Sequence, residues 1–179
     1  MVLSASSFKY NGKVRKPSVK TVKGLSLKSG TDYTVKWSDK NPKNAGIYTL
    51  TVIGTGKYTG IANATYKITK ATNTLNVKGR KATIKYKQLK KKNRKLKVSK
   101  VILFKKKGQG KKTYRIISAK KGKKNFQRYF KINQKTGTMT LVKKLKKGIY
   151  KVKIKVRAAG SINYKPSAWK IVTIKIKVK

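Results

Sequence analysis

The chain contains no cysteine, no histidine and no glutamate, and its only acidic residues are Asp32 and Asp39. General acid–base catalysis draws mainly on His, Glu and Asp, and a Ser–His–Asp or Cys–His arrangement needs residues that are absent here. The soft ligands of zinc are missing, and two carboxylates are too few for a calcium cage. We therefore expect a non-enzymatic protein with no metal and no other cofactor; a lysine nucleophile is the one catalytic alternative, and nothing singles one out.

Against these two acids stand 51 basic residues, for a net charge of +49 on 179 residues. Two surface lysines about 7 Å apart in water repel by roughly 0.6 kcal/mol before salt screening. An anionic partner would relieve that repulsion. Lys outnumbers Arg by 45 to 6, which favours attraction to charge density over the planar, bidentate recognition that Arg provides. The expected partners are teichoic acid, glycosaminoglycan, anionic membrane or cell surfaces, and non-specific DNA or RNA; no small-molecule substrate is expected.

The hydrophobic pattern argues against disorder, which high net charge would otherwise favour. Residues Ile149–Arg157 alternate between apolar and basic side chains, and Thr173–Lys179 does the same. Period-2 alternation is typical of half-buried strands. We predict an all-β protein of two tandem immunoglobulin-like β-sandwich domains, monomeric, with these two matching segments paired so that lysines lie opposite lysines.

The two domains are predicted from a shift in charge near residue 70. Residues 1–70 carry 13 basic and 2 acidic side chains, whereas residues 71–179 carry 38 basic side chains and no acid. Expected strands in the first domain are 18–22, 33–38, 46–54 and 61–69. Expected strands in the second are 75–77, 82–86, 101–104, 113–118, 129–132, 138–142, 149–157 and 169–179.

The first domain resembles the immunoglobulin-like repeats of surface or secreted proteins of Gram-positive bacteria (Firmicutes). The resemblance rests on five segments in order: 8–13 (FKYNGK), 16–19 (KPSV), 29–35 (SGTDYTV), 44–52 (NAGIYTLTV) and 54–60 (GTGKYTG). It implies a secreted or cell-surface location for this chain, as a fragment of a larger protein. The N-terminal segment 1–7 lacks a signal-peptide pattern, and no apolar run is long enough for a transmembrane helix.

The second domain is similar to the lysine-rich, cadherin-like C-terminal repeats of the same class of protein. Segment 130–141 (FKINQKTGTMTL) is similar to a hairpin of those domains, and 148–152 (GIYKV) and 158–165 (AAGSINYK) follow it. Cadherins bridge their domains with calcium held by Asp and Glu. Because this domain has neither, calcium is not carried over from the resemblance.

The candidate polyanion-binding residues are the basic clusters of the second domain and the lysines on its longest strands. Solvated turns are the alternative for any single cluster, because most clusters are expected between strands. Trp37, Trp169 and most tyrosines are expected to be packing residues, with an exposed tyrosine platform for sugar rings, at Tyr10 or Tyr58, as the alternative. The candidates are Lys90, Lys91, Lys92, Arg94, Lys95, Lys105, Lys106, Lys107, Lys143, Lys144, Lys146, Lys147, Lys151, Lys153, Lys155, Arg157, Lys175 and Lys177.

The leading hypothesis is a non-enzymatic module of an exported bacterial protein that binds anionic polymers through a cationic β-sandwich surface. The structural alternative is a stalk that spaces another domain from the cell. A third class is non-specific nucleic-acid binding, and an engineered, supercharged scaffold would have the same composition. No helix-turn-helix, zinc finger or interleaved aromatic RNA-binding motif supports specific nucleic-acid recognition.

Overall fold

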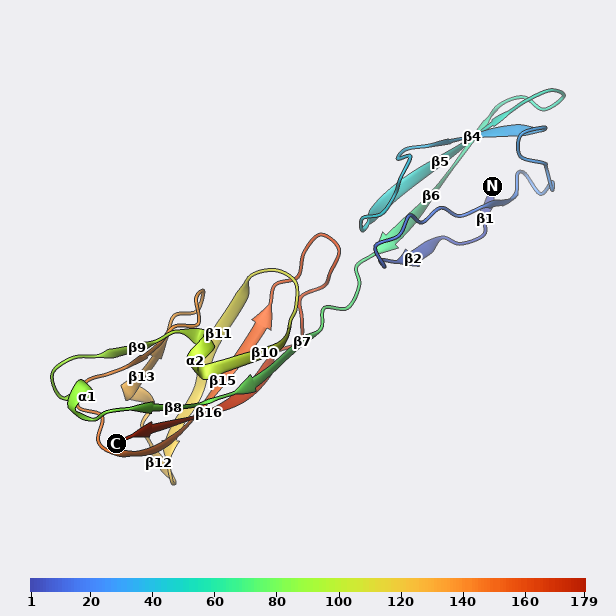
Figure 1. Cartoon of the computed structure of the whole chain (residues 1–179). Coiled ribbons are helices and arrows are strands. Elements are labelled where there is room, and N and C mark those ends of the chain that lie inside the picture. Colours follow the sequence, from blue (N-terminus) through green and yellow to red (C-terminus); the bar gives the residue numbers. More distant parts are fainter. The chain divides into compact units, whose positions relative to one another are not determined.

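Alternating apolar and polar residues form strands throughout the chain. The computed structural model describes residues 1–179, of which 51% are in strands and 7% in helices, so the predicted all-β class is confirmed. The chain divides into two compact units (Figure 1). Unit 1 comprises Met1–Ala71 with Ile162–Tyr164, and unit 2 comprises Thr72–Ser161 with Lys165–Lys179.

Unit 1 contains a four-stranded sheet in the order β2-β6-β5-β4 and a separate two-stranded sheet, β1-β3. β2 runs parallel to β6, and the other pairs are antiparallel. The strands are β1 (Val2–Leu3), β2 (Ser7–Lys9), β3 (Val19–Thr21), β4 (Tyr33–Trp37), β5 (Gly46–Gly54) and β6 (Ile61–Thr69).

Tyr66 is the centre of an aromatic group in the core of unit 1. Tyr66 is 2% exposed, and the rings of Phe8 and Trp37 meet it edge-on while that of Tyr48 stacks on it. Its hydroxyl has no hydrogen-bond partner. Burial, followed by the nearby Tyr48 and Asp39, raises the pKa of Tyr66 to about 12. Aromatic packing thus stabilises a domain that has few aliphatic core residues.

Unit 2 is built on a five-stranded sheet in the order β12-β11-β15-β16-β8. All its pairs are antiparallel except β16 with β8, which run parallel. These strands are β8 (Lys81–Ile84), β11 (Lys112–Lys121), β12 (Lys124–Asn125), β15 (Gly148–Ala158) and β16 (Lys170–Val178).

A second layer faces this sheet. It consists of the three-stranded sheet β13-β14-β9 and the two-stranded ribbon β10-β7, with three short helices. Its elements are β7 (Leu75–Gly79), α1 (Lys87–Lys91), β9 (Arg94–Leu96), α2 (Val98–Val101), β10 (Ile102–Lys107), η1 (Gln127–Tyr129), β13 (Phe130–Ile132) and β14 (Met139–Leu141).

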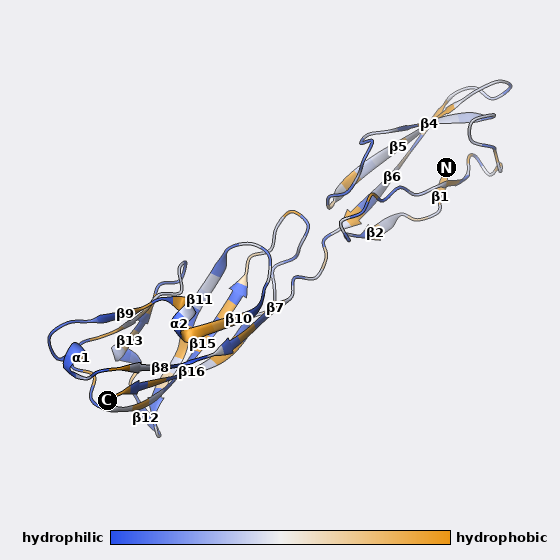
Figure 2. Ribbon diagram, in the orientation of Figure 1, coloured by the Kyte–Doolittle hydropathy of each residue, from blue (hydrophilic) through white to orange (hydrophobic).

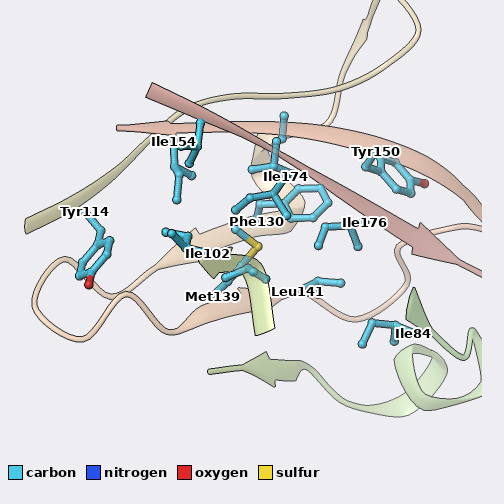
Figure 3. Packing of buried hydrophobic residues seen from close by; sticks show 14 of the residues in the cluster. Ile84, Ile102, Tyr114, Phe130, Met139, Leu141, Tyr150, Ile154, Ile174 and Ile176 are labelled. Carbon is cyan, nitrogen blue, oxygen red and sulfur yellow. The ribbon is translucent and has the colours of Figure 1, made fainter. Parts of the chain in front are cut away.

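The core of unit 2 lies between the two layers. Ile154 and Ile174 from the five-stranded sheet lie near Ile102, Met139 and Leu141 from the second layer (Figure 3), and all of these are buried. Apolar and polar residues alternate along β15 and β16 (Figure 2). Because the apolar side of each strand faces this core, the polar side of the five-stranded sheet faces solvent.

The long C-terminal strands agree with the prediction, and their pairing is confirmed. The expectation that lysines face lysines along this pair holds at one position only, where Lys151 lies opposite Lys175. Elsewhere Lys153 faces Thr173 and Lys155 faces Ile171, because the register brings the lysines of β15 opposite the uncharged half of β16.

The expectation that most basic clusters lie between strands holds only in part. Residues 105–107 are in β10, residues 90–91 are in α1, and residues 94–95 are in β9. Only the cluster 143–147 lies wholly in a connection, between β14 and β15. Short lysine runs can enter these elements because their exposed sides are open to water.

Candidate anion-binding surface

The solvent-facing side of the five-stranded sheet, here called the outer face, carries exposed lysines on four adjacent strands. Along Tyr150–Val156 of β15 and Val172–Val178 of β16 the outward residues are exposed or partly exposed, while every intervening residue is buried. The predicted residues that the outer face brings together are Lys151, Lys153, Lys155, Arg157, Lys175 and Lys177.

Four lysines lie directly opposite one another across four adjacent strands. Lys81 of β8 faces Lys175 of β16, which faces Lys151 of β15, which in turn faces Lys120 of β11. All four are exposed. Because neighbouring strands are about 4.8 Å apart, this lysine row crosses roughly 14 Å of the sheet at right angles to the strands.

Unit 2 has two lysine-lined hollows, and the first of them adjoins the lysine row. One, of about 470 Å³, is lined by Lys81, Lys151, Lys175 and Lys177, with Ile149, Ala82 and Thr83 as its uncharged floor. The other, of about 410 Å³, lies at the end of the same strands and is lined by Lys85, Tyr86, Lys87, Lys90, Lys147 and Lys179. β8 and β16 line the first hollow, and Lys85 and Lys179, which directly follow these two strands, line the second.

The lysine row has no role in stability that the structure reveals. Unit 2 has no acidic residue, so none of the four ammonium groups has a carboxylate side chain to pair with. Like charges directly opposite in a sheet are destabilising. A lysine at a sheet edge discourages strand addition, which accounts for Lys81 on the edge strand β8. It does not account for Lys175 and Lys151, which lie on inner strands.

A second group of predicted residues gathers at one end of unit 2. The backbone amide of Lys143 donates to the side-chain oxygen of Asn93 (2.8 Å), and that of Lys144 donates to the carbonyl of Leu89 (2.8 Å). These bonds join two clusters that are fifty residues apart in the sequence. The residues gathered here are Lys90, Lys91, Lys92, Arg94, Lys95, Lys143, Lys144, Lys146 and Lys147.

The remaining predicted residues, Lys105, Lys106 and Lys107, lie on β10 in the second layer. They are exposed, but the core separates their layer from the outer face. The structure therefore does not assemble all the predicted residues into one surface.

Two members of the lysine row were missing from the sequence prediction, Lys81 and Lys120. Lys120 belongs to a recognisable basic cluster, but a bulge in β11 between Ile116 and Ser118 sets which side of the sheet it occupies. Lys81 enters the row through the parallel pairing of β8 with β16. No short-range sequence signal specifies that pairing.

Unit 1 contains a more apolar hollow, lined among others by Leu25, Leu27, Tyr33 and Val52. Its volume is about 180 Å³, below the roughly 300–1,000 Å³ of typical small-molecule pockets. Nothing charged converges on it apart from Lys23. The anion-binding argument therefore concerns unit 2.

No helix in the structure is long and apolar enough to span a membrane. No protein-family model matches the chain, and no curated protein matches it.

Solved structures that align with the chain contain tandem extracellular cadherin (EC) domains. Human mucin-like protocadherin EC1-2 aligns with 9% identity and a TM-score of 0.49, over 99% of this chain and 97% of that one. Mouse protocadherin-24 EC1-3 aligns with 14% identity and a TM-score of 0.44, over 98% of this chain and 63% of that one. The human desmocollin-1 ectodomain aligns with 14% identity and a TM-score of 0.43, over 100% of this chain and 39% of that one.

Proposed function

We propose that unit 2 is a non-enzymatic module that binds a linear anionic polymer along its outer face. The observation that carries the proposal is the lysine row, in which four exposed lysines lie opposite one another across four strands without an acidic residue in the unit. A polymer lying along the row would place successive anionic groups near successive ammonium groups. Binding would then relieve repulsion that the isolated protein retains.

The polymer class that this surface favours is a cell-wall or cell-surface polyanion, such as teichoic acid or a glycosaminoglycan. The motifs of unit 1 that resemble bacterial immunoglobulin-like repeats support an exported, surface-attached protein of a Gram-positive bacterium. Duplex DNA would also bind through its phosphates, with an affinity that falls steeply as salt increases.

The experiment compares two double variants of the full chain that carry the same net charge. Lys151→Gln with Lys175→Gln removes the centre of the lysine row. Lys95→Gln with Lys131→Gln removes two exposed lysines from the three-stranded sheet, where each lies opposite Thr140 rather than another lysine. Both variants are titrated with heparin, poly(glycerol phosphate) and duplex DNA at increasing salt.

We expect the row variant to lose about 30-fold in affinity at low salt, taking about 1 kcal/mol for each lysine beside an anionic surface. The control should lose much less. Equal losses in the two variants would contradict a site on the outer face and indicate general polycation behaviour. Failure of the unmodified chain to bind any of the three polymers at physiological salt would instead support the stalk.

A further inference from the structure

Three basic side chains converge on one tryptophan at the end of the outer face remote from Lys177. The Lys155 ammonium lies 4.9 Å from the centroid of the Trp169 ring, the Arg157 guanidinium carbon 5.7 Å, and the Arg115 guanidinium carbon 5.9 Å. No other ring in the protein has more than one such neighbour. We call this group the Trp169 cluster.

The sheet register builds the cluster. Arg115 of β11 lies directly opposite Lys155 of β15. Arg157 is two residues farther along β15 and therefore on the same side of the sheet. β15 and β16 are antiparallel and Val156 lies opposite Lys170. The next residue of β15, Arg157, is therefore beside Trp169, which immediately precedes β16. The cluster is thus on the same face as the lysine row, and Lys155 is four residues, or roughly 13 Å, from Lys151.

Packing alone does not explain the cluster. A single cation over an indole ring is a common stabilising contact, but three cations around one ring repel one another. No carboxylate side chain of unit 2 can compensate, because the unit contains neither Asp nor Glu. The cluster also contains two of the six arginines of a chain that otherwise uses lysine. Arginine is the residue suited to planar, bidentate contacts with carboxylate and similar oxyanions.

We propose that the Trp169 cluster is a subsite for one acidic sugar residue of the polymer. Arg115 and Arg157 would bind its carboxylate or sulfate oxygens, and the partly exposed indole of Trp169 would pack against the C–H groups of its ring. The inference rests on the proposed function and narrows the ligand class to an acidic polysaccharide. A poly(glycerol phosphate) chain has no ring to pack on the indole.

Nucleic acid fits the cluster less well. Proteins that bind single strands stack successive bases on successive aromatic side chains, whereas Tyr114 and Tyr150 of the same sheet are buried. Trp169 is therefore a single platform. In duplex DNA the bases are already stacked on one another and do not offer a face to it.

The fluorescence emission of Trp169 can report binding at the cluster. The chain has two tryptophans, so Trp37→Phe leaves Trp169 as the only indole of the full chain. This single-tryptophan protein is titrated with a short heparin oligosaccharide, with poly(glycerol phosphate) of matched charge, and with single-stranded DNA. We expect a saturable change in Trp169 emission with the oligosaccharide at about 150 mM salt, and a much smaller change with the other two.

Two variants separate the subsite from the lysine row. Trp169→Leu should weaken oligosaccharide binding about fivefold to tenfold and leave poly(glycerol phosphate) binding unchanged. Arg115→Lys keeps the charge of an exposed residue but removes the planar guanidinium that makes bidentate contacts. It should therefore reduce the preference for the oligosaccharide over poly(glycerol phosphate). This variant tests the subsite even if Trp169→Leu does not fold. The Lys151→Gln and Lys175→Gln pair should instead weaken binding of both polymers.

Unchanged oligosaccharide binding in Arg115→Lys, together with silent Trp169 emission, would overturn the subsite while leaving the polyanion-binding proposal intact. A larger emission change with single-stranded DNA than with the oligosaccharide would overturn the sugar assignment. Absence of binding to every polymer would overturn both proposals.

Discussion

Replacing Lys175 with Gln should make unit 2 more stable and at the same time a weaker ligand for polyanions. Lys175 lies between Lys151 and Lys81 in the lysine row. If their ammonium groups are about 7 Å apart in water, each pair costs roughly 0.6 kcal/mol before screening. Removing the central charge relieves two pairs, so the free energy of unfolding should rise by about 1 kcal/mol at low salt. For a domain of about 100 residues this corresponds to about 4 °C in Tm.

The assay is thermal unfolding of the full chain at about 10 mM and about 1 M salt, where the Debye length falls from roughly 30 to 3 Å. The increase in Tm caused by Lys175→Gln should be present at low salt and largely disappear at high salt. The matched control is Lys95→Gln, because Lys95 lies opposite Thr140 in its sheet. If Lys175→Gln melts at or below the temperature of the control at low salt, the row is not under electrostatic repulsion and the reasoning fails.

Three further predictions concern stability. The pKa of Tyr66 is raised from 10.0 to about 12, so the free energy of unfolding of unit 1 should be unaffected by this group below pH 10 and should fall as pH rises towards 12. Tyr66→Phe should reduce this alkaline loss by roughly 2–3 kcal/mol in denaturant titrations. At pH 7 the same variant should be close to neutral, since the hydroxyl has no hydrogen-bond partner. Asn73 is buried and its side chain both donates to the Gln109 carbonyl (3.0 Å) and accepts from the Gln109 amide (2.7 Å), so Asn73→Ala should lower the free energy of unfolding of unit 2 by about 2 kcal/mol, and an unchanged denaturation midpoint would contradict this. A Cβ on Gly79 would meet the Thr173 carbonyl of β16, so Gly79→Ala should cost about 3 kcal/mol by the same measurement, and wild-type stability would refute the close approach of β7 to β16.

Much of the fold could be predicted from alternation alone. β5 and β6 begin and end where the sequence pattern indicates, and β15 and β16 agree within a residue or so. The strands that were missed are short ones, such as β2 and β9, because three residues do not show a period. The segment with α1 was not expected to be helical, since consecutive lysines carry no helical apolar stripe.

The candidate surface could be predicted only in part. Lys151 and Lys175 follow from the alternation of the two long strands. Their alignment with Lys81 and Lys120 depends on a parallel pair and a bulge, which are set by tertiary packing. The Trp169 cluster had only a weak sequence signal: Arg157 lies on the strand predicted to pair with that of Trp169, whereas no pairing was predicted for the strand of Arg115.

The measurement that tests the central claim most directly is the salt dependence of heparin binding by a fourfold variant of the lysine row. Lys81, Lys120, Lys151 and Lys175 are changed to Gln, and the matched control changes four exposed lysines of the second layer, namely Lys78, Lys95, Lys105 and Lys131. In a plot of log K against log salt, each lysine that neutralises an anionic group contributes roughly 0.7–0.9 to the slope. We predict that the magnitude of this slope is smaller by about 3 in the row variant than in the unmodified chain, and that it changes much less in the control. Equal slopes in the two variants would contradict binding along the outer face.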